Sequence, residues 1–186
     1  PRALPIVLPT ADGMAVVVGG GGYTGNSIAP TPELYSPADN SFTKISDEIF
    51  PEEPGWMLIS IQSVIDETRL LDGRYLLLGY RTVNSASVYS LIVFDPVTKA
   101  FSKFATSPDL PDSRSMSWWA PLLNSSKTVA YLPGLTTNSP AELNLLRVDL
   151  ATGKIAMPQV PAVRPQVYSF YGAAACLLQD GQVMIC

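Results

Sequence analysis

The sequence predicts an all-β protein built from repeated units of four short antiparallel strands, and three observations lead to this prediction. Turn-forming residues are abundant, with 13 Gly and 17 Pro among 186 residues, while charged residues make up only 15%, against roughly 25% in an average soluble domain. Short runs of β-branched and aromatic residues stand between these turns, and no long amphipathic helical pattern interrupts them. The third observation is an internal repeat of 54 to 59 residues.

The first landmark of the repeat is an Asp-Gly pair placed directly before an apolar strand. Its copies are Asp12-Gly13, Asp72-Gly73 and Asp180-Gly181, with Ser125-Ser126-Lys127 as a degenerate copy. Asp tolerates a positive φ and Gly adopts it freely, so we expect a two-residue type I′ hairpin turn at each pair.

The second landmark is a turn followed by an apolar residue five positions later. It falls at Pro37 and Phe42, at Pro96 and Phe101, and at Leu150 and Ile155. Both members of the first two copies are 59 residues apart, and both members of the next two are 54 apart. Two landmarks that shift together argue for a true repeat.

Each unit is expected to hold four strands, which in the first unit span Leu4 to Pro9, Met14 to Gly20, Glu33 to Pro37 and Phe42 to Ile45. The predicted units are 1–57, 58–115, 116–168 and an incomplete 169–186. One such sheet cannot bury both of its faces, and radial packing of successive sheets in a β-propeller solves this problem. We therefore expect about three and a half blades of a propeller whose ring this chain alone does not close.

The repeat resembles the kelch motif of β-propellers. The residues that carry the resemblance are Gly19-Gly20, Tyr35, Pro37 and Phe42, and again Gly79, Phe94-Asp95-Pro96 and Phe101. The chain departs from that motif because Phe42, Phe101 and Ile155 stand where a tryptophan is usual, and because only the first unit keeps both glycines.

A second resemblance begins at Tyr171, where the segment to Val183 is similar to a strand of galactose-oxidase-like and glyoxal-oxidase-like propellers. In that family the strand can supply a copper-binding tyrosine followed by histidine. Here Tyr171 matches the tyrosine, but Gly172 stands at the histidine position. The resemblance implies the blade architecture without the copper site, and we expect no cofactor and no metal within these residues.

Composition excludes several function classes. The chain has no histidine, so Ser-His-Asp, Cys-His and His-metal chemistry are absent from it. The net charge is −4 and the Lys and Arg residues are scattered, so the sequence predicts no basic patch that would bind nucleic acid. The longest apolar stretches are far shorter than the roughly 20 residues that span a bilayer. Cys176 and Cys186 flank a predicted hairpin, and either a disulfide or two buried thiols fits that pattern.

Candidate binding residues lie on the long segments that join strands, because loops on a rigid scaffold commonly carry binding groups. These segments are Gly21 to Pro32, Ser46 to Ser60, Tyr80 to Ser87, Ala105 to Ser117, Gly134 to Leu143 and Met157 to Ser169. The candidates are Tyr23, Asn26, Trp56, Tyr80, Arg81, Arg114, Trp118, Trp119, Tyr168 and Tyr171. Packing between units is the alternative for Trp118 and Trp119, and a solvated surface position is the alternative for Arg81 and Arg114.

Two function classes follow. The favoured one is a non-catalytic propeller that presents loops to a protein or glycan ligand, with the remaining blades of the same propeller as further partners. The alternative is part of a galactose-oxidase-like or sugar-epimerase-like enzyme whose catalytic residues lie outside this segment. Low charge and the acceptor sequon Asn124-Ser125-Ser126 favour a secreted or periplasmic location over a cytoplasmic one.

Overall fold

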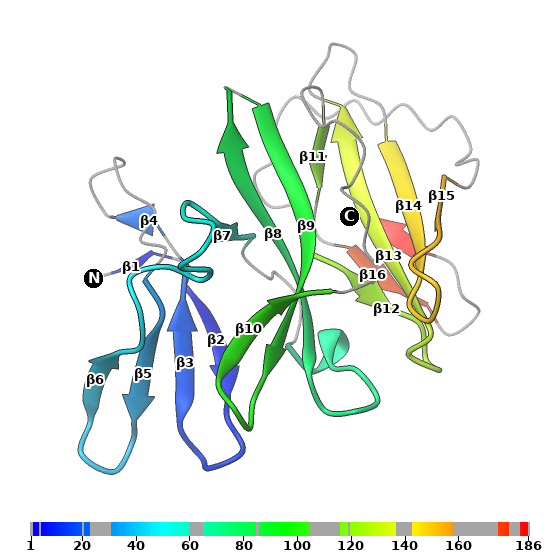
Figure 1. Ribbon diagram of the computed structural model, residues 1–186. Helices are drawn as coiled ribbons and strands as arrows, with labels where there is room; N and C mark the ends of the chain where they lie inside the picture. The colour runs from blue at the N-terminus through cyan, green and yellow to red at the C-terminus, as the bar shows by residue number, and fades with distance from the viewer. Residues whose placement is uncertain are drawn as a thin grey trace.

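The structure of the chain is a computed structural model, and it describes residues 2–3, 5–19, 21–22, 31–59, 65–84, 86–104, 116–118, 120–136, 143–157, 175–178 and 183–185. Within these residues the chain is all-β apart from the short 3-10 helix η1, Ile65–Thr68. Three antiparallel sheets, each four strands across, follow one another along the chain (Figure 1). The predicted all-β fold with repeated four-stranded units is confirmed.

The first sheet is a meander whose strands are paired in chain order. It consists of β2 (Ile6–Pro9), β3 (Ala15–Val18), β5 (Glu33–Ser36) and β6 (Ser41–Lys44). Each strand lies within two residues of its expected bounds. Beside this sheet, β1 (Arg2–Ala3) pairs with β4 (Gly21–Gly22).

The second sheet repeats this meander around a longer central hairpin. Its strands are β7 (Met57–Leu58), β8 (Tyr75–Val83), β9 (Ala86–Asp95) and β10 (Ala100–Lys103). Tyr80 to Ser87 was expected to be a loop, and this expectation is wrong: β8 and β9 stay paired up to Val83 and Ala86. The ladder between β8 and β9 continues there, although the side chains beyond Tyr80 are mostly polar.

The third sheet has a divided edge. Both β11 (Met116–Trp118) and β12 (Leu122–Leu123) pair with β13 (Val129–Thr136), which continues into β14 (Leu143–Asp149) and β15 (Ile155–Ala156). A proline cannot donate to a ladder, and Pro121 lies directly before β12. The expected loop from Gly134 to Leu143 is wrong at its start, because β13 runs to Thr136.

A last pair of strands, β16 (Ala175–Leu177) and β17 (Val183–Ile185), forms a two-stranded sheet. Its register sets Cys176 opposite Met184. Cys186 lies outside the described residues, so the suggested disulfide remains a prediction.

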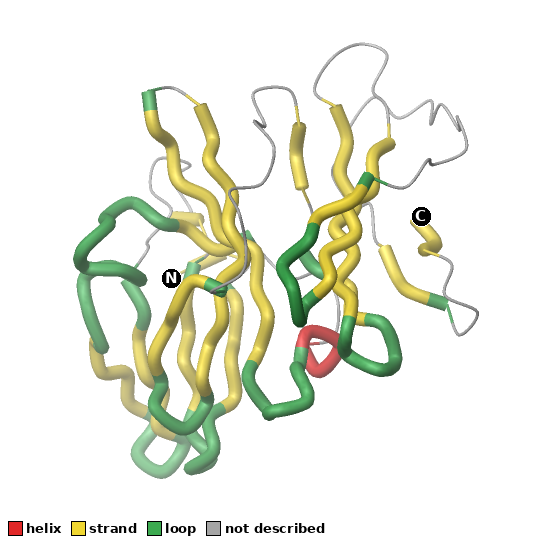
Figure 2. Tube along the Cα trace, turned by 45° about the vertical axis from the view of Figure 1, so that its right-hand side comes forward, coloured by secondary structure: helices red, strands yellow, loops and turns green. Residues whose placement is uncertain are grey.

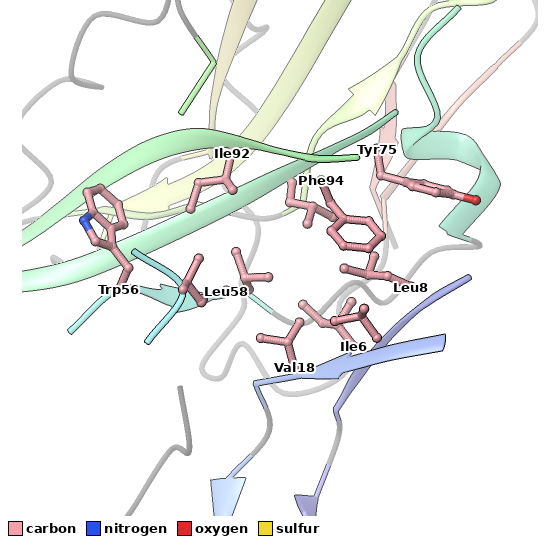
Figure 3. Close-up of a cluster of buried hydrophobic side chains, with 11 residues drawn as sticks. Ile6, Leu8, Val18, Trp56, Leu58, Tyr75, Ile92 and Phe94 are labelled. Atoms are coloured by element: carbon pink, nitrogen blue, oxygen red, sulfur yellow. The ribbon is translucent and has the colours of Figure 1, made fainter. Parts of the chain in front are cut away.

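The sheets stack face to face, and the second sheet lies between the other two (Figures 1 and 2). One of its faces packs Tyr75, Leu77, Ile92 and Phe94 on Ile6, Leu8, Val16 and Val18 of the first sheet (Figure 3). Its other face packs Leu76, Leu78, Leu91 and Val93 on Ala130, Leu132, Leu146 and Val148 of the third sheet. This stacking is compatible with a segment of a propeller.

Burial on both faces explains the sequence of the central strands. Residues 75–78 and 91–94 are continuous apolar runs rather than alternating ones, as a strand covered on two sides requires. Full burial of one such side chain contributes about 1.5–3 kcal/mol. The second sheet therefore supplies much of the core.

The hairpin turns differ from the type I′ turns that we expected. Gly13 and Gly73 have φ values of 79° and 86°, but Asp12 and Asp72 do not have positive φ. The amide of Gly13 donates to the Thr10 carbonyl at 3.2 Å, and Gly73 does the same to Leu70 at 3.1 Å. Each loop thus has three residues with the glycine in the left-handed region, the second commonest hairpin geometry.

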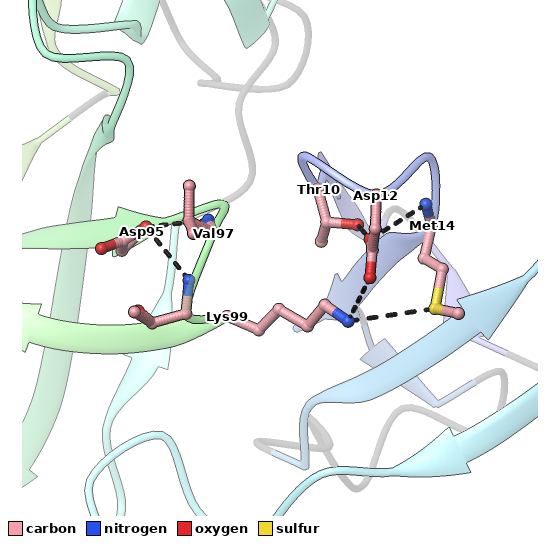
Figure 4. A network of polar contacts seen from close by, with 7 residues as sticks. Thr10, Asp12, Met14, Asp95, Val97 and Lys99 are labelled. Carbon is pink, nitrogen blue, oxygen red and sulfur yellow. Dashed lines mark hydrogen bonds and ion pairs between the residues drawn. The ribbon is translucent and has the colours of Figure 1, made fainter.

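A polar contact joins the hairpins of the first two sheets. The ammonium of Lys99 lies 2.6 Å from the Asp12 carboxylate, as Figure 4 shows, and the Ala11 amide donates to the Pro96 carbonyl at 3.0 Å. The hydrogen bond from Lys99, together with one from Thr10, lowers the pKa of Asp12 from 3.8 to about 2. The two apolar faces are therefore held in register at this end.

Substitution of Gly79 by alanine tests the close packing inside the second sheet. A Cβ on Gly79 would overlap Cδ1 of Ile92 and approach the Met57 carbonyl to 3.3 Å, so Gly79→Ala should destabilise the fold by about 1–3 kcal/mol. Because valine lacks that Cδ1 atom, Ile92→Val should recover part of the loss in the double variant. Urea unfolding of the four proteins measures the coupling, and purely additive effects would contradict this packing.

The Asp12–Lys99 contact predicts a pH-dependent stability. A carboxyl whose pKa is lower in the folded state stabilises that state above its unfolded pKa of 3.8, and this stabilisation is lost as pH falls toward the folded value of about 2. The difference in unfolding free energy between wild type and Asp12→Asn should thus be largest near neutral pH and shrink below pH 3.8. Lys99→Met should remove most of this pH dependence, and an unchanged profile in that variant would count against the assignment.

Candidate functional site

The β8–β9 hairpin extends beyond the strands that flank it in the second sheet. Within the described residues, β7 pairs only with Tyr80 and Gly79, and β10 pairs with β9 no further than Ile92. From Arg81 outward, the two strands of the hairpin therefore pair only with each other, and Figure 1 shows them rising from the sheet. Thr82, Val83 and Asn84 at the tip are exposed.

Two of the candidate residues named from the sequence, Trp56 and Arg81, meet at the base of this projection, and a third, Tyr80, lies there on the opposite face of the sheet. Trp56 lies in the segment before β7, and Tyr80 and Arg81 lie side by side in sequence on β8. Trp56 is 1% exposed and belongs to the core between the first two sheets (Figure 3). It cannot offer its ring face to a ligand, so its role is to support the side chains above it.

Two cations lie over the Trp56 ring. The Arg81 guanidinium carbon is 5.3 Å from the ring centroid and the Lys103 ammonium is 5.0 Å from it, both within cation–π range. Phe50 packs edge-on against the same ring at 6.1 Å. The buried indole thus fixes the positions of two charged groups that stay about one third exposed, at 31% for Arg81 and 40% for Lys103.

Glu53 is the shared partner of these groups. Lys103 donates to both carboxylate oxygens at 2.7 Å, Arg81 Nη1 lies 3.2 Å from Oε2, and the Trp56 indole donates to Oε2 at 3.4 Å. The hydrogen bond from Lys103 is the main cause of the lowered pKa of Glu53. The carboxylate therefore stays ionised at neutral pH and accepts hydrogen bonds there.

Strand alternation explains how Arg81 and Lys103 come together. Arg81 lies opposite Val88 and Lys103 lies opposite Ile92, so both cations are on the face of the second sheet that packs toward the first sheet. The Nε of Arg81 is buried and lacks a hydrogen-bond partner in the part of the chain that the structure describes. An unsatisfied buried donor costs about 1–3 kcal/mol, so this packing leaves the Arg81 guanidinium short of one hydrogen bond.

Tyr80 belongs to the other face of the hairpin. Its ring stacks on Tyr89 with centroids 5.7 Å apart, and both pack against the core shared with the third sheet. Burial raises the pKa of both phenols, so both stay protonated at neutral pH. Tyr80 and Arg81 therefore face different sheets although they are neighbours in sequence.

The remaining candidates are not tested by the structure. Tyr23, Asn26, Arg114, Trp119, Tyr168 and Tyr171 lie outside the described residues, and for Trp118 only the strand position opposite Gly134 is given. These residues stay predictions.

Neither Lys103 nor Glu53 was among the candidates named from the sequence. Glu53 lies close to Asp47, Glu48 and Glu52 in the sequence, and these four carboxylates lack the alternating spacing of a calcium site. In the structure Asp47 pairs with Lys44, Glu48 accepts from the Gly55 amide, and Glu53 binds the two cations. The described residues contain no group of three or more side chains suited to hold a metal ion.

Comparison with known proteins adds no relative. No family model matches the chain, and no curated protein matches it. Among the described residues, no helix has the length and apolar character needed to cross a membrane. The group formed by Glu53, Trp56, Arg81 and Lys103, called the Trp56 cluster below, therefore stands on its geometry alone.

Removal of the shared carboxylate should loosen the Trp56 cluster. Glu53→Gln leaves Arg81 and Lys103 close together without their counter-ion, so the thermal unfolding midpoint should fall at low salt and recover partly at high salt, because salt screens the repulsion. The matched control is Glu52→Gln, the exposed neighbouring carboxylate, which should change the midpoint little. Equal effects of the two substitutions would show that Glu53 has no special role.

Proposed function

We propose that this chain is a non-catalytic binding module with β-propeller architecture, which takes a protein or a glycan as its ligand. The observation that carries the proposal is the Trp56 cluster at the base of the projecting β8–β9 hairpin. There, a buried indole orients an arginine, a lysine and a carboxylate that all remain partly exposed.

The chemistry of the cluster supports binding. Arg81 and Lys103 are permanent donors at neutral pH, and the ionised Glu53 is an acceptor. Donors and acceptors held on a rigid sheet lose little conformational entropy when a ligand binds. Hydroxyl groups of a glycan, or backbone and side-chain amides of a protein loop, are the groups that such a set recognises.

The hairpin beyond the cluster supplies a second contact area. Thr82, Val83 and Asn84 are exposed and lie next to Arg81 along the chain. A ligand that reaches the cluster would also contact this tip, which favours an extended glycan or a protein segment over a small molecule.

Binding should depend on the cluster and not on charge elsewhere. The experiment applies the full chain to a glycan array and measures any positive glycan by calorimetry. Arg81→Gln with Lys103→Gln should weaken binding at least tenfold, which corresponds to about 1.4 kcal/mol. The matched control is Arg74→Gln, since Arg74 precedes the opposite end of β8 and pairs with Asp72 at 2.6 Å.

A protein ligand is tested by photo-crosslinking from the hairpin. A benzophenone amino acid that replaces Val83 should capture one defined protein from an extract. The same amino acid in place of the exposed Val97, in the turn between β9 and β10, should capture none. The proposal is wrong if the glycan array is blank and both positions give the same crosslinks. Peroxide release from galactose or glyoxal-type substrates in the presence of copper would also contradict it.

A further inference from the structure

The turn between β12 and β13 is closed by an asparagine side chain. Oδ1 of Asn124 accepts hydrogen bonds from the backbone amides of Thr128 and Val129, both at 2.9 Å. The backbone closes the same turn, because the Asn124 amide donates to the Val129 carbonyl at 3.0 Å and the Lys127 amide donates to the Asn124 carbonyl at 2.9 Å. The carboxamide of Asn124 is therefore held in one orientation by groups of its own turn.

The nitrogen of this carboxamide lies among hydroxyl groups. Nδ2 of Asn124 donates to Oγ of Ser126 at 2.8 Å and to Oγ1 of Thr128 at 3.2 Å, and these two hydroxyl oxygens are 2.9 Å apart. Ser125, Ser126 and Thr128 are exposed, and Asn124 is partly exposed. The carboxamide nitrogen is thus placed at the surface of the third sheet.

Other turns of the chain show that aspartate can close a turn in this way. Oδ1 of Asp149 accepts from the amides of Ala151 and Thr152 at 3.1 and 2.9 Å, and from the Thr152 hydroxyl at 2.8 Å. Asp95 likewise accepts from two backbone amides in the second sheet. A carboxylate accepts such bonds more strongly than a neutral carboxamide does. The turn itself therefore does not require the nitrogen that distinguishes asparagine from aspartate.

The residues that follow Asn124 give this nitrogen a chemical use. Asn124-Ser125-Ser126 has the Asn-x-Ser pattern of N-glycosylation acceptors. The pattern requires a hydroxyl two residues after the asparagine, and this hydroxyl on Ser126 lies within hydrogen-bond distance of Nδ2. The two groups that the pattern requires are thus neighbours on an exposed turn.

We propose that Asn124 is a glycosylation site, with an N-linked glycan bound to Nδ2. The glycosyl donor is a lipid-diphosphate-linked oligosaccharide. Nδ2 forms a bond to C1 of the first sugar, and the bond between C1 and the diphosphate oxygen breaks. The proton that Nδ2 loses balances the charge of the lipid diphosphate that leaves, and no atom is oxidised or reduced.

A glycan on Nδ2 is compatible with the fold of the turn. Glycosylation replaces one of the two hydrogens on Nδ2, so the carboxamide keeps its oxygen acceptor and one N–H donor. Oδ1 can still accept from the amides of Thr128 and Val129, and the remaining N–H can donate to one of the two hydroxyls. The β12–β13 hairpin should therefore keep its structure when the glycan is attached.

The site lies away from the Trp56 cluster. Figure 1 shows the β12–β13 turn at the lower end of the third sheet and the tip of the β8–β9 hairpin at the top. At this lower end the Lys127 ammonium lies 3.5 Å from the Glu67 carbonyl of η1. The inference therefore does not rest on the proposed binding function, and either can fail without the other.

Expression of the full chain in a eukaryotic cell, behind a cleavable secretion leader, tests the proposal. Intact mass should show a glycan that peptide-N-glycosidase F removes, and peptide mapping should then find aspartate in place of Asn124, because this enzyme converts the glycosylated asparagine. Both the secreted chain and the chain retained in the cell are analysed, since the glycan is attached before secretion. A wild-type chain that carries no glycan in either fraction, or carries one only on another asparagine, overturns the proposal.

Substitutions in the turn separate glycosylation from folding. Asn124→Asp should remove the glycan and leave the circular dichroism spectrum unchanged, because a carboxylate still accepts from both amides. Ser126→Ala should also remove the glycan, whereas Ser126→Thr should keep it.

The matched controls are Ser125→Ala, at the exposed middle position of the pattern, and Thr128→Ala, which removes the other hydroxyl that Nδ2 contacts. Both variants should carry the glycan as the wild type does. A glycan that persists in Ser126→Ala, or that is lost equally in Ser125→Ala, contradicts the assignment.

Discussion

Burial of the second sheet on both faces is the constraint on which the rest of the structure depends. Its two apolar runs, 75–78 and 91–94, supply one face to the core with the first sheet and the other to the core with the third. Each outer sheet has one covered face in this arrangement, so neither could keep its apolar residues from water without the second. The three sheets are therefore expected to unfold together rather than one at a time.

The same constraint positions the candidate site. Trp56 is buried because it fills the edge of the core between the first two sheets, and its ring then fixes Arg81 and Lys103. The outer face of the first sheet follows from the same geometry, because each sheet of the repeat uses one face to cover its neighbour and offers the other to be covered. The Trp56 cluster and the outer face of the first sheet thus arise from one packing scheme.

The sequence predicted those strands that are bounded by turn residues next to them in the chain. The first-sheet strands were placed within two residues because the Asp12-Gly13 and Pro37 turns bound them closely. The segment from Tyr80 to Ser87 was misread as a loop because the residues after Tyr80 extend beyond the flanking strands of the sheet and are mostly polar, so they lack the apolar pattern of a strand. The turn type was also wrong, since an Asp-Gly pair fits both a two-residue and a three-residue loop. The cluster could not be assembled from sequence, because Lys103 reaches Glu53 across 50 residues through the register of β10.

Native-state hydrogen exchange tests the central role of the second sheet most directly. The account predicts that amides of Leu76 to Leu78 and Leu91 to Phe94 exchange last, at the free energy of global unfolding, and that amides of β3 and β13 are the next most protected. The contrary result would be protection of β3 or β13 that persists after the amides of β8 and β9 have exchanged, because it would show that an outer sheet is stable without the second.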